Sequence, residues 1–373
     1  MPPRFWHVFP SFGAAGTQLR LVAIINALGD RFSHSVIALD GCTEAASRIN
    51  VSRGVEIVSA PKDRGLFTSP FALYQIIRRR RPDLLLTYNW GAMHAVMAAG
   101  PSRLCPILHN ECGLGADEAD RLKVRRVIAR RLLLRFVQGT IVTSRALWRV
   151  AHERYRVPLE KLTWIRTGVD TERFYPRRSP EWRRRLGAGD STVVLGYAGG
   201  LRPEKNLPML LKAFAESAVP EARLALLGDG PCQRQLEALA AALGISRQVV
   251  FAGHSDDVPA FMGALDVFVM SSATEQTSNA LLEAMASGLP VLATDVGDTA
   301  ELFDPGYPSM VVARGDVTAY GRSLRRLVCE PALRAELGAV NRRRVLDRFS
   351  FDNMVSQYGA LFDSAVKKVR NAR

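Results

Sequence analysis

The sequence predicts an α/β protein built from two doubly wound domains, each with a parallel sheet covered by helices on both faces. Its 373 residues amount to about two and a half typical domains of roughly 150 residues, which favours two domains over one. Short apolar runs alternate with amphipathic stretches through both halves of the chain, as in βαβ units. Residues 176–191 are charged, contain Pro and Gly and have no strand pattern, so we expect the domain boundary there.

Composition narrows the class of protein. Apolar residues make up 47% and charged residues 23% of the chain, which is ordinary globular composition. No run approaches the roughly 18 uninterrupted apolar residues that a membrane-spanning helix requires. His7, Pro10 and Gly13 interrupt the apolar N-terminal run, so we expect no signal peptide. The five widely spaced cysteines predict free thiols in a reduced cytoplasm rather than a disulfide scaffold.

The first half is expected to contain six strands separated by helices. The strands are expected at residues 5–9, 35–40, 55–58, 84–88, 105–109 and 139–144. The helices are expected at residues 18–28, 70–80, 94–99, 122–136 and 146–155. We therefore assign residues 1–180 to the first domain.

The second half repeats the same alternation. Its strands are expected at residues 193–199, 222–230, 248–253, 267–272, 290–295 and 309–313. Its helices are expected at residues 207–217, 233–243, 258–264, 278–287 and 318–330, followed by a helical tail. We assign residues 190–345 to the second domain. Because doubly wound domains bind ligands at the carboxyl ends of their strands, two of them in tandem predict a central cleft that both domains face.

The chain is strongly basic. The formal net charge is +14, with 50 Lys and Arg against 36 Asp and Glu. Such a charge favours phosphate-bearing partners, which include nucleotides, nucleic acids and anionic membranes.

The strongest candidate site lies in residues 271–294. A strand is expected to end at Ser272, and a helix to begin near Thr277 or Ser278, either of which can cap it. The free N–H groups and the dipole of such a helix start form an anion site. Glu275 lies in the loop and Glu283 about a turn and a half into the helix. The alternative is a capped helix with solvent-facing carboxylates.

This segment resembles the Glu-x7-Glu signature of retaining glycosyltransferases of family 4, which have the GT-B fold of two Rossmann-like domains. Those enzymes move a sugar from a nucleoside diphosphate to an acceptor. The resemblance implies that Glu275 contacts the transferred sugar and that Glu283 hydrogen-bonds the ribose. It also implies that backbone amides after Glu275 bind sugar hydroxyls, and these belong to Thr277, Ser278, Asn279 and Ala280. By the same resemblance, helices over residues 346–373 pack back on the first domain.

A second candidate site is the glycine-containing loop within residues 196–214. Negative charge builds on the departing β-phosphate during transfer, and fixed Arg and Lys donors stabilise it. The segment resembles the family's Gly-Arg-Leu…Glu-Lys-Asn loop, and Lys205 falls on its phosphate-binding Lys. Gly200 stands where the family has Arg. We expect Arg202 to supply this guanidinium from a shifted position; an ordinary surface arginine is the alternative.

Two further positions lie in the first domain. Residues 11–28 resemble the family's Gly-Gly-x-Glu/Gln loop, which closes over the donor phosphates and faces the acceptor. Gly16 would allow backbone to approach a phosphate, and Gln18 would face the acceptor; a simple tight turn is the alternative. His109, at the end of an expected strand, falls on the family's His that lines the cleft near the sugar. A structural hydrogen-bonding role is its alternative.

Two stretches of the first half are rich in arginine. Residues 76–83 and 120–136 interleave cations with Leu, Ile and Val at helical spacing. They predict either amphipathic helices with a solvated arginine face or docking on anionic lipid, where each near-surface cation contributes about 1 kcal/mol.

No Asp-x-Asp pair is suited to a divalent ion, and the histidines lack ligand spacing, so we expect neither metal nor cofactor.

Together these observations predict a cytoplasmic, metal-independent, retaining glycosyltransferase, with peripheral membrane contact if the basic helices bind lipid. The resemblance to family 4 implies that it moves a hexose-type sugar from a UDP- or GDP-linked donor to a glycan or lipid-linked acceptor, in surface polysaccharide biosynthesis. One alternative is a nucleotide-sugar 2-epimerase of the same architecture. Another is a basic nucleic-acid-binding protein, although the chain lacks a recognition motif, so no specific nucleic acid is expected.

Overall fold

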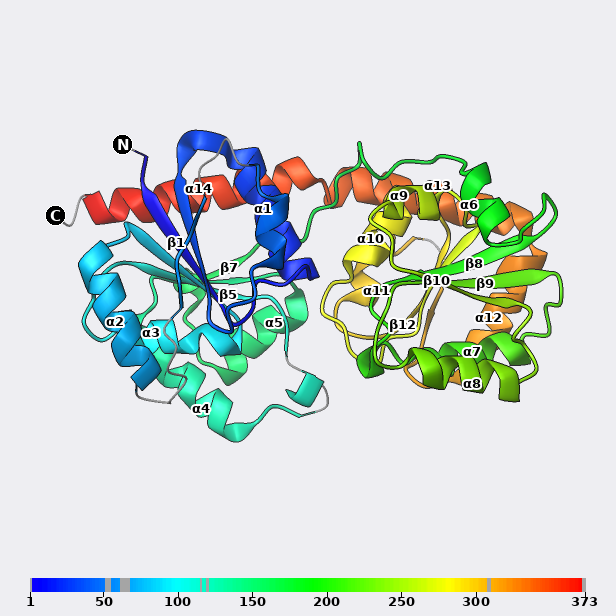
Figure 1. Ribbon diagram of the computed structural model, residues 1–373, viewed down its shortest axis with the longest axis horizontal. Helices are drawn as coiled ribbons and strands as arrows, with labels where there is room; N and C mark the ends of the chain where they lie inside the picture. The colour runs from blue at the N-terminus through cyan, green and yellow to red at the C-terminus, as the bar shows by residue number, and fades with distance from the viewer. Residues whose placement is uncertain are drawn as a thin grey trace. The chain divides into compact units, whose positions relative to one another are not determined.

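The chain forms two compact units (Figure 1). The computed structural model describes residues 2–50, 55–60, 68–114, 116–118, 121–306 and 310–370. The first unit runs to Arg166 and resumes at Asn353, and the second unit is Thr167–Asp352. Residues 167–180, assigned above to the first domain, belong to the second unit, because Val169 and Phe174 are buried in its hydrophobic core.

The first unit is built on a seven-stranded parallel sheet. The strand order is β3-β2-β1-β4-β5-β6-β7, so the chain leaves β1 in one direction and returns beside it at β4. The strands are β1 (Arg4–Phe9), β2 (Ser33–Ala38), β3 (Glu56–Ile57), β4 (Leu84–Tyr88), β5 (Ile107–Glu111), β6 (Gly139–Val142) and β7 (Leu162–Trp164). The reversal between β1 and β4 is a topological switch point, where loops diverge and leave room for a ligand.

Helices cover both faces of this sheet (Figure 1). On one face lie α2 (Thr68–Arg80), α3 (Met93–Ala99), α4 (Val124–Leu133) and α5 (Arg145–Arg149). The other face carries α1 (Gly16–Leu28) and α14 (Phe351–Arg370). Phe5 of β1 lies 5.2 Å from Phe362 of α14 and 4.5 Å from Phe32, between ring centroids, so the last helix of the chain completes the core of the first unit.

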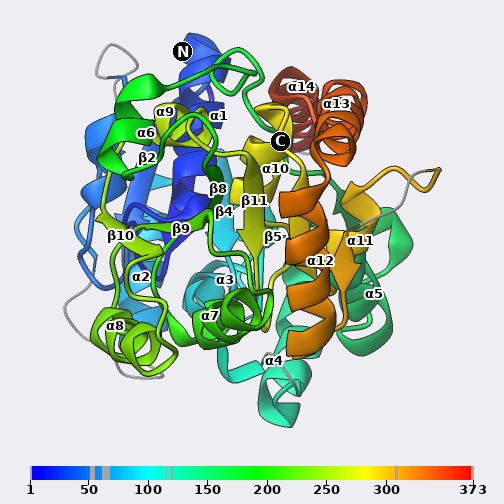
Figure 2. The same ribbon diagram turned by 90° about the vertical axis from the view of Figure 1, so that its right-hand side faces the viewer.

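The second unit repeats this plan with six parallel strands (Figure 2). The order β10-β9-β8-β11-β12-β13 again places the first and fourth strands side by side. The strands are β8 (Val193–Ala198), β9 (Ala222–Leu227), β10 (Val249–Gly253), β11 (Val267–Met270), β12 (Val291–Thr294) and β13 (Val311–Val312). Their side chains are mostly buried, as expected for a parallel sheet covered on both faces.

The second sheet is also covered on both faces. One face carries α6 (Pro180–Arg185), α9 (Val258–Met262), α10 (Asn279–Ala286) and α11 (Thr299–Leu302). The other carries α7 (Leu207–Glu216), α8 (Gln233–Ala242) and α12 (Val317–Cys329). Helix α13 (Pro331–Arg348) contributes Leu337 to one core cluster and Val345 to the other.

Arginines of α13 hold the ends of three neighbouring helices. Arg334 Nη1 lies 2.8 Å from the carbonyl oxygens of both Leu327 and Val328 in the last turn of α12. Arg342 donates to the last carbonyl oxygen of α10, and Arg344 to carbonyl oxygens of the last two residues of α11. These carbonyl groups have no partner within their own helices, so the cations satisfy them and complement the helix dipoles.

The structure differs from the expected elements in several places. Strand β5 ends at Glu111, so His109 lies within the strand and not at its end. The three-residue strand β7 was not predicted, because it is short and only half-buried. Helix α6 forms inside the expected linker, with Pro180 at its first position and Trp182 buried. Ser309 and residues 371–373, which fall in predicted elements, lie outside the described residues.

A buried ion-pair network joins α4 to the sheet. Arg130 Nε lies 2.9 Å and Nη2 3.2 Å from the two carboxylate oxygens of Glu111, and both side chains are 1% exposed. The guanidinium of Arg130 also lies 3.5 Å from Glu118 and 4.8 Å from the ring centroid of Tyr155. Burial alone would raise the pKa of Glu111, but a hydrogen bond from His109 and the charge of Arg130 outweigh it and lower the pKa.

We expect Arg130→Met to lower the free energy of unfolding by about 3–5 kcal/mol, because it leaves the Glu111 carboxylate buried without a counter-charge. Urea unfolding measures the loss. The double variant Arg130→Met with Glu111→Gln removes both charges and should recover much of it. A loss below about 1 kcal/mol in the single variant would contradict the structural role of this pair.

Candidate functional site

Two loops meet at the switch point of the second sheet. One follows β8 and includes residues 199–206, and the other follows β11 and includes residues 271–278. The backbone N–H of Ala273 donates to the carbonyl oxygen of Glu204 at 2.8 Å. The hydroxyl of Ser271 donates to the carbonyl oxygen of Lys205 at 2.9 Å. The two predicted donor-binding segments are therefore in direct contact, although about 70 residues separate them in the chain.

Lys205 and Glu275 form an ion pair across these loops. Lys205 Nζ lies 2.5 Å from Glu275 Oε2, and the two side chains are 24% and 18% exposed. The hydroxyl of Ser272 lies 3.5 Å from the same carboxylate oxygen. Both charged groups remain accessible, so an anionic ligand reaching Lys205 would also be adjacent to Glu275.

Helix α10 begins at Asn279, four residues after Glu275. Ser278 is its N-cap, and the Ser278 hydroxyl accepts a hydrogen bond from the N–H of Leu281 at 3.4 Å. Thr277, Asn279 and Ala280 are half-buried around this first turn. The helix start therefore presents backbone N–H groups and the positive end of the helix dipole at the carboxyl edge of the sheet.

Glu283 lies in the second turn of α10 and is half-buried. Burial raises its pKa to about 7, and the nearby positive charge of Arg173 opposes the shift. A carboxyl group with this pKa changes its charge within the physiological range. Ligand hydroxyls that donate to the carboxylate would favour its charged form.

Two glycines allow the neighbouring loops to pack against this site. Gly228 has φ +126°, and a Cβ there would lie 2.1 Å from the carbonyl oxygen of Gly199. Gly297 has φ +57°, and a Cβ there would lie 2.1 Å from the carbonyl oxygen of Glu275. Any other residue would displace the backbone that carries the Lys205–Glu275 pair.

Arg202, which we expected to supply the guanidinium that is missing at Gly200, lies close to Gly200. The hydroxyl of Tyr197 donates to the carbonyl oxygen of Gly200 at 3.0 Å. The exposed side chain of Arg202 lies alongside, with Nε 3.1 Å from the place that a Cβ of Gly200 would occupy. Burial raises the pKa of Tyr197, Glu275 and Glu204 raise it further, and Arg202 lowers it. Arg202 is therefore within electrostatic reach of the same cluster.

The predicted residues of the first unit have different surroundings. Gly16 begins α1 and is exposed after β1. Gln18 donates from Nε2 to the carbonyl oxygen of Ser11 at 2.8 Å, so its amide holds the preceding loop. His109 is fully buried.

Both ring nitrogens of His109 have partners. Nδ1 lies 2.8 Å from the Thr87 hydroxyl, and Nε2 lies 3.5 Å from Glu111. This geometry favours the structural alternative for His109 and gives its predicted catalytic role no support, because a ligand would have to displace one of two buried partners.

The first unit also contains a polar cluster that the sequence did not indicate. Arg20 and Thr17 of α1 both hydrogen-bond the thiol of Cys112, which follows β5. Tyr88 and Tyr358 are near enough to Arg20 to interact with its charge. Thr17 and Arg20 are three residues apart on a helix, which was a detectable signal, but nothing in the sequence pairs them with Cys112 or Tyr358.

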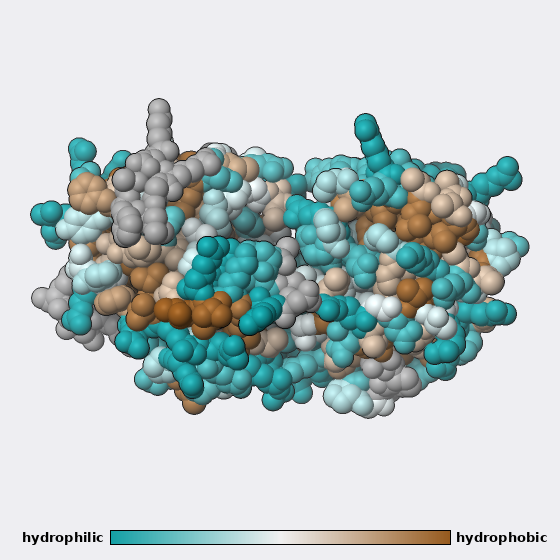
Figure 3. All heavy atoms as spheres, turned by 90° about the horizontal axis from the view of Figure 1, so that it is seen from below, coloured by the Kyte–Doolittle hydropathy of each residue, from teal (hydrophilic) through white to brown (hydrophobic). Residues whose placement is uncertain are grey.

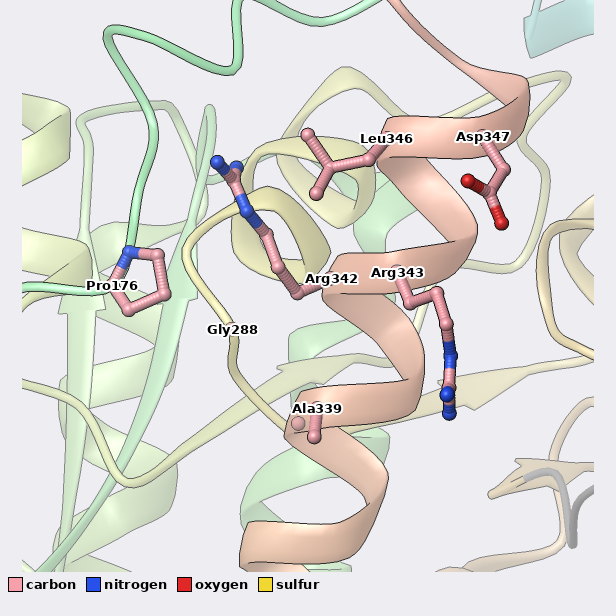
Figure 4. A pocket seen from close by; sticks show the side chains of 8 residues that line it. Pro176, Gly288, Ala339, Arg342, Arg343, Leu346 and Asp347 are labelled. Carbon is pink, nitrogen blue, oxygen red and sulfur yellow. The ribbon is translucent and has the colours of Figure 1, made fainter.

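A pocket of about 440 Å³ lies elsewhere in the second unit, between α13 and the end of α10 (Figure 4). Arg342 and Leu346 extend from α13 toward Pro176, with Gly288 nearby. Arg342 donates to the carbonyl oxygens of Thr171, Phe174 and Ala286. The guanidinium group is thus hydrogen-bonded to backbone carbonyl groups. The pocket lies at the opposite end of α10 from Ser278.

The residues that the structure describes lack a metal-binding cluster and a membrane-spanning helix. Among them, no group of three or more His, Cys, Asp or Glu side chains is arranged to hold a metal ion. Within the same part of the chain, no helix combines the length and apolarity needed to cross a membrane.

The fold and the site together define a glycosyltransferase of the two-domain GT-B class. Residues 178–344 match the family of glycosyl transferases group 1, and residues 14–173 match Glycosyltransferase Family 4. The chain therefore belongs to glycosyltransferase family 4, and the predicted family and fold class are confirmed.

Individual proteins show how far this likeness extends. The chain is 32% identical to 2-deoxystreptamine glucosyltransferase of Streptomyces kanamyceticus, over 79% of this chain and 81% of that protein. It is 34% identical to the lipopolysaccharide core biosynthesis glycosyltransferase LpsE of Rhizobium meliloti, over 47% of this chain and 51% of that protein. The match thus spans from about half to about four fifths of the length of these relatives.

A solved structure shows the same fold. HepE of Anabaena, in complex with UDP and glucose, superposes with a TM-score of 0.84 at 21% sequence identity. The match covers 97% of this chain and all of the HepE chain.

We expect nucleotide binding to depend on the charge of Glu283. With a pKa of about 7, Glu283 is mostly neutral at pH 6 and mostly charged at pH 8. If ribose hydroxyls of a bound nucleotide donate to the carboxylate, the dissociation constant of that nucleotide should fall by up to about tenfold between these pH values. Calorimetric titrations at pH 6 and pH 8 measure this change. Glu283→Gln should bind more weakly and remove this part of the pH dependence, whereas an unchanged pH dependence in that variant would contradict the assignment.

The same shift predicts a stability change without ligand. The native state holds the Glu283 proton more tightly than the unfolded state, whose pKa is near 4.5. The free energy of unfolding should therefore fall as pH rises from about 4.5 to above 7, by about 1–3 kcal/mol from this group. Glu283→Gln should lack this decrease.

Proposed function

We propose that the protein transfers a hexose-type sugar from UDP to a hydroxyl of a glycan or lipid-linked acceptor, with retention of configuration and without a metal ion. The observation that carries the proposal is the Lys205–Glu275 pair at the start of α10. A cation for phosphate and a carboxylate for sugar hydroxyls lie 2.5 Å apart, so their ligands must be adjacent parts of one molecule. A nucleoside diphosphate sugar has this arrangement of groups.

Lys205 would stabilise the leaving diphosphate. As the bond between the anomeric carbon and the β-phosphate oxygen breaks, negative charge develops on the phosphate. The ammonium group of Lys205 and the N–H groups of α10 would bind this charge more strongly in the transition state than in the ground state. Arg202, next to Gly200, would supply a second cation. These groups together provide the positive field that a divalent ion provides in other transferases.

Glu275 and Glu283 would orient the donor. Glu275 leaves its ion pair with Lys205 when the phosphate arrives, and it then accepts hydrogen bonds from sugar hydroxyls. Glu283 lies five residues after Ser278, which is roughly 7 Å along the helix axis. This separation suits a carboxylate that accepts hydrogen bonds from a ribose while the diphosphate stays at the helix start.

The acceptor would attack from the face that the phosphate leaves. The acceptor oxygen bonds to the anomeric carbon, its proton passes to the departing phosphate oxygen, and the configuration is retained. Glu275 is the sole carboxylate in the sequence 271–280, and in the donor complex it accepts hydrogen bonds from sugar hydroxyls. Its role in orientation therefore leaves it poorly placed to act as a covalent nucleophile.

Support for the donor and the acceptor differs in strength. HepE was solved with UDP and glucose, which favours UDP over GDP. LpsE acts in lipopolysaccharide core biosynthesis, which favours surface polysaccharide as the acceptor class. The Streptomyces relative instead acts on 2-deoxystreptamine, so the acceptor is the less constrained partner. An epimerase would need several acid and base groups around the sugar, whereas residues 271–280 supply one carboxylate, Glu275.

A nucleotide screen tests the donor. The melting temperature should rise with UDP and with one UDP-hexose, and rise less with GDP or ADP, because only a ligand of the folded state stabilises it. The matching UDP-sugar should then be consumed in the presence of acceptor and excess EDTA, and NMR of the product should show the donor's anomeric configuration. A selective rise with GDP would replace the donor, and loss of activity that Mg²⁺ restores would refute metal independence.

Lys205→Ala should lower kcat about 10²–10³-fold, as expected for loss of a donor that stabilises transition-state charge. Arg202→Ala should lower it by a smaller factor. Steady-state kinetics with the donor found in the screen measures both. Lys212→Ala, an exposed lysine on α7, is the matched control and should leave kcat unchanged. Near-normal turnover in Lys205→Ala would remove Lys205 from the leaving-group site.

A further inference from the structure

Helix α4 has an apolar row on its outer face. Val124, Ile128, Leu132 and Phe136 are spaced four residues apart along α4 and the 3-10 turn that follows it. They are 64%, 51%, 52% and 47% exposed, respectively. Residues at this spacing lie above one another on a helix, so the four side chains form one continuous strip.

The inner face of the same helix is already satisfied. Val127, Arg130 and Leu134 point into the first unit and are buried. Arg130 is held by Glu111 of β5, which fixes the rotation of the helix about its axis. The apolar row therefore cannot turn inward without breaking the buried ion pair.

Exposed arginines accompany the row. Arg121, Arg125 and Arg135 are exposed. Arg125 lies three residues before Ile128 on α4, so it projects from the same side of the helix, and Arg121 and Arg135 flank the helix in the chain. Two other cations of this stretch, Lys123 and Arg126, are paired with Asp117 instead. In the space-filling view from below, on the side where α4 lies in Figure 1, apolar surface is bordered by hydrophilic surface (Figure 3).

We propose that α4 docks on an anionic lipid bilayer, with Val124, Ile128, Leu132 and Phe136 inserted at the boundary between headgroups and acyl chains. An apolar strip with cations beside it has the pattern of an interfacial helix. The arginines attract anionic headgroups, and each cation near the surface strengthens binding about fivefold. A second copy of the chain suits this face less well, because a two-fold contact would bring arginines against arginines.

The topology places the start of α4 at the carboxyl edge of the first sheet. Helix α4 starts after the carboxyl end of β5, so Val124 lies toward the sheet edge that also carries the loop before Gly16. A bilayer along α4 would bring lipid beside that edge. This inference deepens the proposed function, since a lipid-linked acceptor would reside there, but lipid binding itself does not depend on the transfer reaction.

Cosedimentation of the full chain with lipid vesicles tests the docking. The wild-type protein should bind vesicles of phosphatidylcholine containing about one third phosphatidylglycerol, and should bind pure phosphatidylcholine much less. Ile128→Glu with Leu132→Glu should reduce the partition coefficient on anionic vesicles at least tenfold. Arg125→Gln with Arg135→Gln should reduce it about 25-fold, the product of two fivefold effects.

Matched variants separate docking from folding and from donor binding. Leu159→Glu, at an equally exposed leucine outside α4, should bind vesicles as the wild type does. The double variant Ile128→Ser with Leu132→Ser tests the same apolar strip without introducing charge, because the glutamates of the first double variant could disturb the helix. All variants should keep the wild-type thermal shift with UDP.

Two results would overturn the docking proposal. One is absence of wild-type binding to anionic vesicles. The other is wild-type binding by all three double variants, at Ile128 with Leu132 and at Arg125 with Arg135. Vesicle binding without a UDP shift would support docking and refute the proposed donor. A UDP shift without vesicle binding would refute docking alone.

Discussion

The hydrogen bond from Ala273 N–H to the carbonyl oxygen of Glu204 joins the two loops on which the candidate site depends. It forms because β8 and β11 are adjacent and parallel, so both loops leave the sheet at the same edge. Lys205 and Glu275 then meet at 2.5 Å, and α10 begins beside them. The site is therefore a consequence of strand order, and Gly228 and Gly297 allow neighbouring loops to pack against it.

The first unit uses buried charge in a different way. The pair of Arg130 and Glu111 lies in the core, where it orients α4 and occupies one nitrogen of His109. A buried pair of this kind is weak support for stability as such, but breaking it is costly. The Arg130–Glu111 pair fixes the rotation of α4 about its axis. It therefore determines which side chains of α4 point outward.

The basic composition has at least two structural uses besides attraction of phosphate. Arg334, Arg342 and Arg344 close the ends of three helices. Arg183 donates to the carbonyl oxygens of Gly189, Thr192 and Ala264 and so holds the segment after α6. Part of the +14 net charge thus reflects arginines that act as multidentate partners of backbone carbonyl groups.

The sequence by itself determined the two parallel sheets and the family. Apolar runs separated by amphipathic stretches are local patterns, and the motifs around Lys205 and Glu275 are contiguous in the chain. Tertiary structure decided what depends on distant residues: the 2.5 Å ion pair, the half-burial that raises the pKa of Glu283, and the burial of His109. It also decided which face of α4 is exposed. The arginines of α4 look alike in the sequence, and only the position of Glu111 on β5 selects Arg130 for the interior and leaves Ile128 and Leu132 at the surface.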